Sequence, residues 1–188
     1  MTVFTKPGIE NTDATLRIAL EAAAKHNLPI VMASNTGTTT EKLLELQQET
    51  GLSAPIVMVG QVYGFSQPGT DALTDEMREK LEAQGVKIVI TAHALSGAER
   101  SISRKFGGVY PAELVAASLR MLSQGTKVCV EIGMMAMDCG ALEYGKPVVA
   151  IAGSGRGADT VCILTPAYTA SFLDTKIHEI LCKPGLYE

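Results

Sequence analysis

The chain has 188 residues, of which 46% are hydrophobic and 19% are charged, and its net charge is −4. This length fits one domain, here residues 1–188, and lets a compact chain bury roughly 70% of its unfolded surface. The 16 basic residues are dispersed, which excludes the dense Lys and Arg patch of a nucleic-acid-binding protein. No apolar run approaches the roughly 20 residues that cross a membrane, and the first residues lack a signal-peptide core. We therefore expect a single cytoplasmic domain whose partners include neither nucleic acids nor membranes.

Helices and buried strands alternate in the first half of the chain. Residues 12–26 predict a helix, because they carry an apolar stripe and Asn11 or Thr12 can cap the start. The further predicted elements are a strand over 30–33, a helix from the polar run 34–40 to Gly51, a strand over 56–59, a helix over 74–84 and a strand over 86–91. Strand, loop and helix thus follow one another as in an α/β protein.

The second half continues with less regular spacing. Its predicted elements are a long loop over 94–108, a helix over 111–124 stopped by Gly125, a strand over 127–132, a short helix over 134–139 and strands over 147–152 and 161–164. The tail over 175–183 alternates apolar and polar residues, which is typical of a half-exposed antiparallel edge strand. We expect one doubly wound, mostly parallel sheet.

The four cysteines, Cys129, Cys139, Cys162 and Cys182, lie far apart and form no Cys-x-x-Cys pair. The spacing therefore predicts neither a metal site nor a redox pair. Free cysteines are most often buried, so we expect small apolar residues in a reducing compartment.

The polar run Ser34–Thr40 is the most informative loop. Ligands of open α/β sheets bind outside the carboxyl ends of strands, and here hydroxyls and a glycine come directly before a helix. Such donors at the positive end of a helix suit a phosphate group. The alternative is a helix start in which Thr38 or Thr39 bonds its own backbone.

A second glycine-rich segment, Gly153–Asp159, follows the strand predicted over 147–152. Arg156 can meet a phosphate there, and Asp159 can order the turn or accept from a hydroxyl. The alternative is an ordinary hairpin turn, because a strand rather than a helix is predicted to follow.

Two ionisable residues are candidates for proton transfer. His93 follows a predicted strand, and Glu131 interrupts an apolar one, where a carboxylate costs free energy unless it is paired. The alternatives are that His93 only fastens its loop and that Glu131 forms a salt bridge with Arg100 or Arg104.

Several strings in this sequence, taken together, are similar to those of a known protein family. They are Val31-Met32-Ala33-Ser34-Asn35-Thr36-Gly37-Thr38-Thr39, His93-Ala94-Leu95-Ser96-Gly97 with Phe106-Gly107-Gly108, Lys127-Val128-Cys129-Val130-Glu131-Ile132, and Gly157-Ala158-Asp159-Thr160 leading to Leu164-Thr165-Pro166-Ala167. Nearly the whole chain resembles the C-terminal α/β domain of pyruvate kinase, and more closely the archaeal and bacterial proteins that consist of this domain alone. The resemblance implies a three-layer α/β/α sandwich with a mostly parallel, mixed sheet and an antiparallel last strand at its edge.

The resemblance also implies a ligand. In pyruvate kinase the loop similar to 34–39 holds the phosphate of a sugar-phosphate effector, and stand-alone relatives are associated with bound flavin mononucleotide (FMN). It therefore implies phosphate binding at Ser34, Thr36, Gly37, Thr38 and Thr39, with FMN as the cofactor. Pyruvate kinase activity itself is not expected, because the catalytic barrel of that enzyme is a separate domain.

Our leading hypothesis is a protein that binds FMN or a similar phosphorylated small molecule. Two alternatives stay open, a non-catalytic sensor of a sugar phosphate and a small hydrolase or lyase that uses His93 and Glu131. The apolar helix faces are compatible with a homo-oligomer. The candidate binding residues are Ser34, Asn35, Thr36, Gly37, Thr38, Thr39, Gly60, Gly64, His93, Ser96, Gly97, Arg104, Glu131, Gly153 and Arg156.

Overall fold

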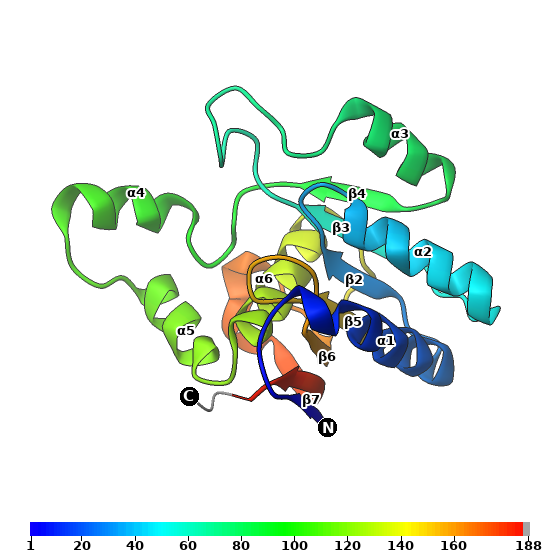
Figure 1. Ribbon diagram of the computed structural model, residues 1–188. Coiled ribbons are helices and arrows are strands. Elements are labelled where there is room, and N and C mark those ends of the chain that lie inside the picture. The colour runs from blue at the N-terminus through cyan, green and yellow to red at the C-terminus, as the bar shows by residue number, and fades with distance from the viewer. Residues whose placement is uncertain (186–188) are drawn as a thin grey trace.

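A seven-stranded sheet lies at the centre of the molecule (Figure 1). The computed structural model describes residues 1–185. The strands are β1 (Thr2–Phe4), β2 (Ile30–Ala33), β3 (Ile56–Gly60), β4 (Lys87–Ile90), β5 (Val148–Ala152), β6 (Thr160–Thr165) and β7 (Lys176–Pro184). Their order across the sheet is β1-β7-β6-β5-β2-β3-β4. Neighbouring strands run parallel except at β6, which is antiparallel to both β5 and β7.

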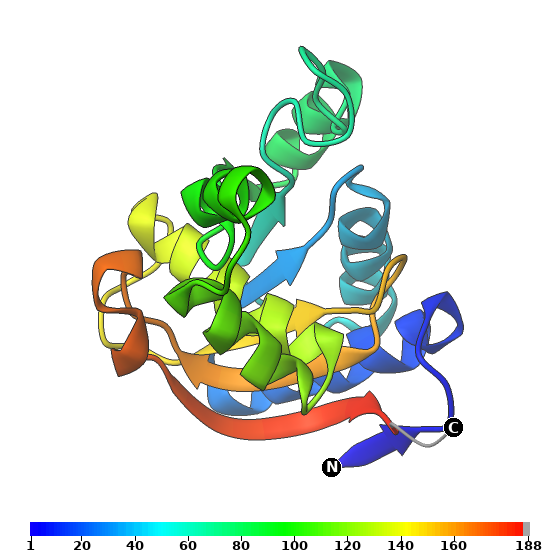
Figure 2. The ribbon, with the colours of Figure 1, turned by 90° about the vertical axis from the view of Figure 1, so that its left-hand side faces the viewer.

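Helices cover both faces of this sheet (Figure 2). They are α1 (Thr12–His26), α2 (Thr38–Thr50), α3 (Asp75–Ala83), α4 (Gly97–Phe106), α5 (Pro111–Arg120) and α6 (Gln124–Asp138). Side chains of α1, α2 and α3 join one core cluster, and those of α5 and α6 join the cluster on the other face. The fold is therefore the expected three-layer α/β/α sandwich with a mostly parallel, mixed sheet.

The central strands are apolar on both faces because both faces are covered. β3 and β5 are buried along their whole length. In β2, Ile30 and Met32 join the core cluster of α1, whereas Val31 joins that of α6. Alternate side chains of one strand thus enter opposite layers, as parallel sheets require.

The first half of the chain matches the prediction closely. α1 has the predicted bounds, α2 ends at Thr50 with Gly51 as its C-cap, and Thr74 caps α3 through its side chain. The predicted cap of α1 is wrong, because the Asn11 side chain makes no capping bond. Instead, the Thr12 hydroxyl donates to the carbonyl of Ile9 at 2.6 Å.

The prediction of a strand over 127–132 is wrong, because these residues form the middle of α6. The hydroxyl of Ser123 accepts from the amide of Thr126 and caps this helix, so Gly125 lies inside α6 and α5 already ends at Arg120. Residues 129–137 are buried without interruption, which gives an apolar run without helical periodicity. Such a run reads equally well as a buried strand or a buried helix.

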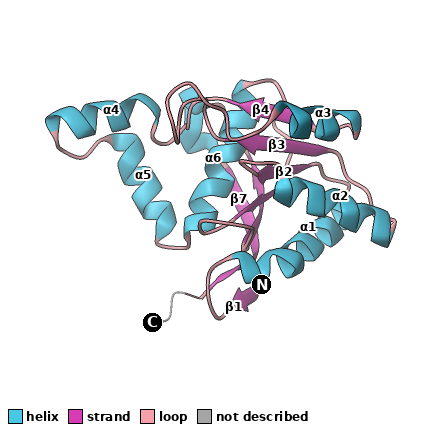
Figure 3. Ribbon diagram, turned by 45° about the horizontal axis from the view of Figure 1, so that its top comes forward, coloured by secondary structure: helices cyan, strands magenta, loops and turns pink. Residues whose placement is uncertain are grey.

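The predicted long loop over 94–108 is also wrong in part, because 97–106 form α4. None of the residues of α4 is buried, and the helix stands apart from the sheet (Figure 3).

The last strand, β7, pairs antiparallel with β6, as expected. It is not the edge of the sheet, however, because β1 pairs with it in parallel on the outer side. The three residues of β1 were not predicted, since so short a strand carries no periodicity.

Gly125 allows α6 to approach β6 closely, which gives a first prediction. A Cβ at this position would lie 2.1 Å from Oγ1 of Thr160. Gly125→Ala should therefore lower the free energy of unfolding by about 1–3 kcal/mol, measured by urea denaturation. Gly97→Ala is the matched control, since a Cβ there meets nothing within 4 Å, and it should change stability by less than about 0.5 kcal/mol. Equal midpoints for the two variants would contradict the close approach.

Candidate functional site

The order of the strands reverses at β2, and a cavity opens at this point. From β2 the chain steps to β3 and β4 and then returns to β5 on the other side of β2. The carboxyl ends of these four parallel strands lie at the same end of the sheet. Residues that follow each strand line a cavity of about 730 Å³ at these carboxyl ends. Ligands of open α/β sheets bind at such a switch point.

The loop after β2 brings the start of α2 to this cavity. The lining residues of this loop are Ser34, Asn35, Thr36, Thr38 and Thr39. Gly37 is the N-cap and has no side chain to bond the first amides of the helix, and the first helical bond runs from Glu41 N–H to the Gly37 carbonyl at 2.9 Å. The amides of 38–40 therefore have no acceptor within the helix. Together with the positive helix end they suit an anion.

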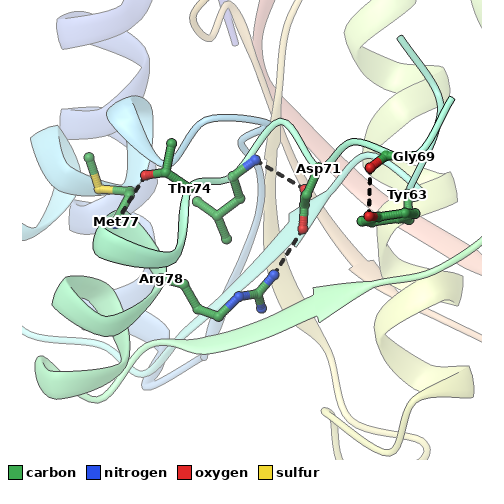
Figure 4. Close-up of polar contacts among 7 residues, drawn as sticks. Tyr63, Gly69, Asp71, Thr74, Met77 and Arg78 are labelled. Atoms are coloured by element: carbon green, nitrogen blue, oxygen red, sulfur yellow. Dashed lines mark hydrogen bonds and ion pairs between the residues drawn. The ribbon is translucent and has the colours of Figure 1, made fainter. Parts of the chain in front are cut away.

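Position 37 requires glycine for two reasons. Its φ of 85° lies in the left-handed region, and a Cβ would lie 2.5 Å from Cγ of Met77 on α3. The amide of Met77 in turn donates to the hydroxyl of Thr74 at 3.2 Å (Figure 4). The start of α3 thus packs against the turn that opens α2.

The loop between β3 and α3, residues 61–74, forms an aromatic wall of the cavity. Hydrogen bonds within this region hold the loop (Figure 4): the hydroxyl of Tyr63 donates to the carbonyl of Gly69 at 2.7 Å, and Arg78 pairs with Asp71 at 3.0 Å. The loop places the Phe65 ring edge-on to His93, with 5.0 Å between the ring centroids. The guanidinium of Arg100 on α4 lies 5.7 Å from the centre of the Phe65 ring.

The glycine-rich turn 153–157 closes the cavity at β5. It joins β5 and β6 as a hairpin, the alternative that the sequence left open. Buried Asp159 orders the turn, because it accepts from the amides of Ser154 and Gly8 at 3.1 and 3.2 Å. The hydroxyl of Thr12 accepts from the amide of Ala158 at 3.1 Å. The N-terminal segment is thereby fixed beside the cavity.

Helix α6 supplies a buried ion pair to the opposite wall. Lys127 and Glu131 pair through Nζ and Oε2, and the side chain of each is 5% exposed. The other oxygen of Glu131 accepts from the amide of Leu95 at 3.0 Å. The predicted partners of Glu131, Arg100 and Arg104, are therefore wrong, because the i,i+4 spacing on a helix supplies Lys127 instead.

Burial also shifts the pKa values of two side chains in this wall, Lys127 and His93. Desolvation lowers the pKa of Lys127, and the Glu131 carboxylate acts in the opposite direction. Desolvation lowers the pKa of His93 as well, again against the effect of Glu131. His93 is therefore a neutral imidazole at neutral pH, able to donate one hydrogen bond and accept another.

The cavity is strongly positive although the chain is acidic overall. Its lining contains five cationic side chains, Lys42, Arg100, Arg120, Lys127 and Arg156, and one carboxylate, Glu131. The whole chain carries a net charge of −4. A cleft of one sign concentrates ligands of the opposite charge.

Most of the sequence-predicted binding residues meet at the cavity. Those that line it are Ser34, Asn35, Thr36, Thr38, Thr39, Gly60, His93, Glu131, Gly153 and Arg156. Gly37, Gly64, Ser96, Gly97 and Arg104 are not among its lining residues. Gly37 acts through the backbone, Gly64 belongs to the loop that carries Phe65, and the other three begin or form α4.

Several lining residues carry no signal of a site in the sequence. They include Ile9, Thr12, Lys42, Gln61, Phe65, Arg120, Gln124, Lys127 and Met135. Most belong to helices or to the N-terminal segment, and only the packing of these elements against the sheet brings them to the cavity. The spacing of Gln124, Lys127, Glu131 and Met135 would have revealed one helix face if 127–132 had been assigned to a helix.

None of the four cysteines is among the lining residues of the cavity. Cys129, Cys162 and Cys182 are buried, as expected, whereas Cys139 is exposed. Burial raises the pKa of Cys182 to about 11. Within residues 1–185 no three His, Cys, Asp or Glu side chains gather as a metal would require. In the same range, no helix is both long and apolar enough to cross a membrane.

Fold and cavity together define an α/β sandwich protein with a cavity at the switch point of its sheet. A family model described as pyruvate kinase, alpha/beta domain, matches residues 12–164. The matched region contains β2 to β5, the ion pair of α6 and every lining residue of the cavity except Ile9. The chain belongs to the pyruvate kinase alpha/beta domain family.

The ion pair of α6 gives a second prediction. Lys127→Gln should lower the free energy of unfolding by about 3–5 kcal/mol, because it leaves the Glu131 carboxylate buried without a counter-charge. The double variant Lys127→Gln/Glu131→Gln should regain most of this loss, because two amides can bond each other. Chemical denaturation of the two variants measures the coupling. If the single and the double variant were equally destabilised, the two side chains would not depend on each other.

Proposed function

We propose that the protein binds a phosphorylated small molecule, FMN in the first instance, in the cavity at the switch point of the sheet. The observation that carries this proposal is the start of α2, where three amides have no helical acceptor and the four hydroxyl residues Ser34, Thr36, Thr38 and Thr39 line a positive cavity. A phosphate group carries the charge and the acceptor oxygens that this set of donors needs.

The charges around the turn and the helix favour a phosphate over a neutral ligand. Lys42 lies in the second turn of α2, where its Nζ is 3.6 Å from Oδ1 of Asp13, and Arg156 lies in the turn after β5. Both side chains line the cavity, and among residues 1–185 no ion pair holds Arg156. A guanidinium is well shaped for phosphate oxygens.

The remainder of the cavity suits a ring system of the size of a flavin. Its volume of about 730 Å³ lies within the range of roughly 300–1,000 Å³ found for small-molecule sites. Phe65 and His93 offer ring surfaces, and Ile132 and Met135 offer apolar ones. Bound FMN would supply redox chemistry, while these residues bind the ring and exclude water from it. FMN is the ligand that the family resemblance implies.

A hydrolase or lyase has less support. It would need a free carboxylate beside His93, but one oxygen of Glu131 pairs with Lys127 and the other accepts from Leu95. We therefore do not assign acid–base catalysis to these two residues.

Fluorescence titration of the apoprotein with FMN and with riboflavin tests the proposal. FMN should bind at least about tenfold more tightly than riboflavin, because each charge-assisted hydrogen bond to the phosphate contributes about 1.5–3 kcal/mol. Arg156→Ala should remove much of this preference, and Arg17→Ala, a change on the exposed side of α1, should not. Equal affinity for FMN and riboflavin would contradict the phosphate site. If ribose phosphate stabilises the protein but FMN does not bind, the proposed phosphate site stands and its ligand is a sugar phosphate, not a flavin.

A further inference from the structure

The ammonium group of Lys127 has more donors than acceptors. It carries three N–H groups, and within residues 1–185 the one side chain that accepts from them is Glu131. The Lys127 side chain is 5% exposed, so bulk water does not satisfy the remaining donors freely. Lys127 nevertheless lines the cavity. A buried cation with free donors at a cavity wall calls for an acceptor on a ligand.

The position of Lys127 indicates which part of the ligand this is. The start of α2 and helix α6 belong to opposite layers of the sandwich. A ligand with its phosphate on α2 therefore extends across the carboxyl edge of the sheet towards α6. There it meets one face of α6, formed by Lys127, Glu131 and Met135, with the ring of His93 beside it.

We infer that Lys127 and Glu131 form a subsite for the ring of bound FMN, in which Lys127 donates a hydrogen bond to a ring acceptor and favours the negatively charged reduced ring. This inference rests on the proposed function, because the phosphate on α2 sets the direction of the ligand. It assigns to the ion pair a role in setting the redox equilibrium of the cofactor.

The electrostatic reason is the charge that the ring gains. When FMN takes up two electrons and one proton from solution, its ring acquires one negative charge. The ammonium of Lys127 attracts this charge, and the carboxylate of Glu131 repels it. The two members of the pair therefore shift the equilibrium between oxidised and reduced FMN in opposite directions, whereas a merely structural pair would shift it in neither.

The test is the midpoint potential of FMN bound to the full chain, measured by dithionite titration. Lys127→Gln should weaken binding of reduced FMN relative to oxidised FMN by about tenfold, which lowers the potential by about 30 mV. Glu131→Gln should raise it by a similar amount. The double variant Lys127→Gln/Glu131→Gln should have a midpoint potential between those of the two single variants. It still allows the comparison if one single variant folds poorly. Lys25→Gln, on the exposed end of α1, is the matched control and should leave the potential unchanged.

Opposite shifts in the two single variants would establish the subsite. If FMN binds but its potential is the same in all variants, or moves in one direction in both, the inference fails and the proposed function stands. If Lys127→Gln weakens FMN but leaves riboflavin binding unchanged, Lys127 contacts the phosphate instead, which also overturns the inference. If the unaltered protein binds no FMN, the proposal of a flavin ligand fails with it.

Discussion

The Lys127–Glu131 ion pair is the interaction on which the position of α6 depends. Nearly all residues of this helix are buried, and two of them are charged. Each of these charges alone would cost several kcal/mol in the interior, so the helix can lie against the sheet only because they meet. Glu131 also accepts from the amide of Leu95 and thereby ties the segment after β4 to α6. The wall of the cavity and the place of His93 follow from this one pair.

The reversal of strand order at β2 provides the other half of the site. It separates the loops after β2 and β5, so that the donors at the start of α2 and the turn 153–157 face one space. Gly37 makes this possible by leaving the first amides of α2 uncapped and by letting Met77 pack close. Cations from helices of different layers converge there, which makes a positive cavity in an acidic protein. The cavity therefore has polar groups at the start of α2 and the aromatic rings of Phe65 and His93 elsewhere in its wall.

Much of this arrangement could be predicted from the sequence because it depends on local signals. The apolar runs of β2, β3 and β5 and the polar run before α2 are visible in a few residues each. The run over 127–132 misled the prediction, since a helix buried on all sides shows no helical period. The sequence does not reveal that Phe65, Lys42 and Arg120 line the cavity, because only the packing of their elements brings them there. The partner of Glu131 was missed for the same reason as the helix, since the i,i+4 pair exists only if the segment is helical.

The central claim is that a phosphate group of the ligand lies on the first amides of α2. Amide chemical shifts in a ¹⁵N NMR titration with FMN test it most directly. The largest shifts are expected for the amides of Thr38, Thr39 and Thr40, with smaller ones in the turn 153–157. Shifts confined to other surfaces, such as the groove between Leu44 and Val86 on the far side of α2, would contradict it.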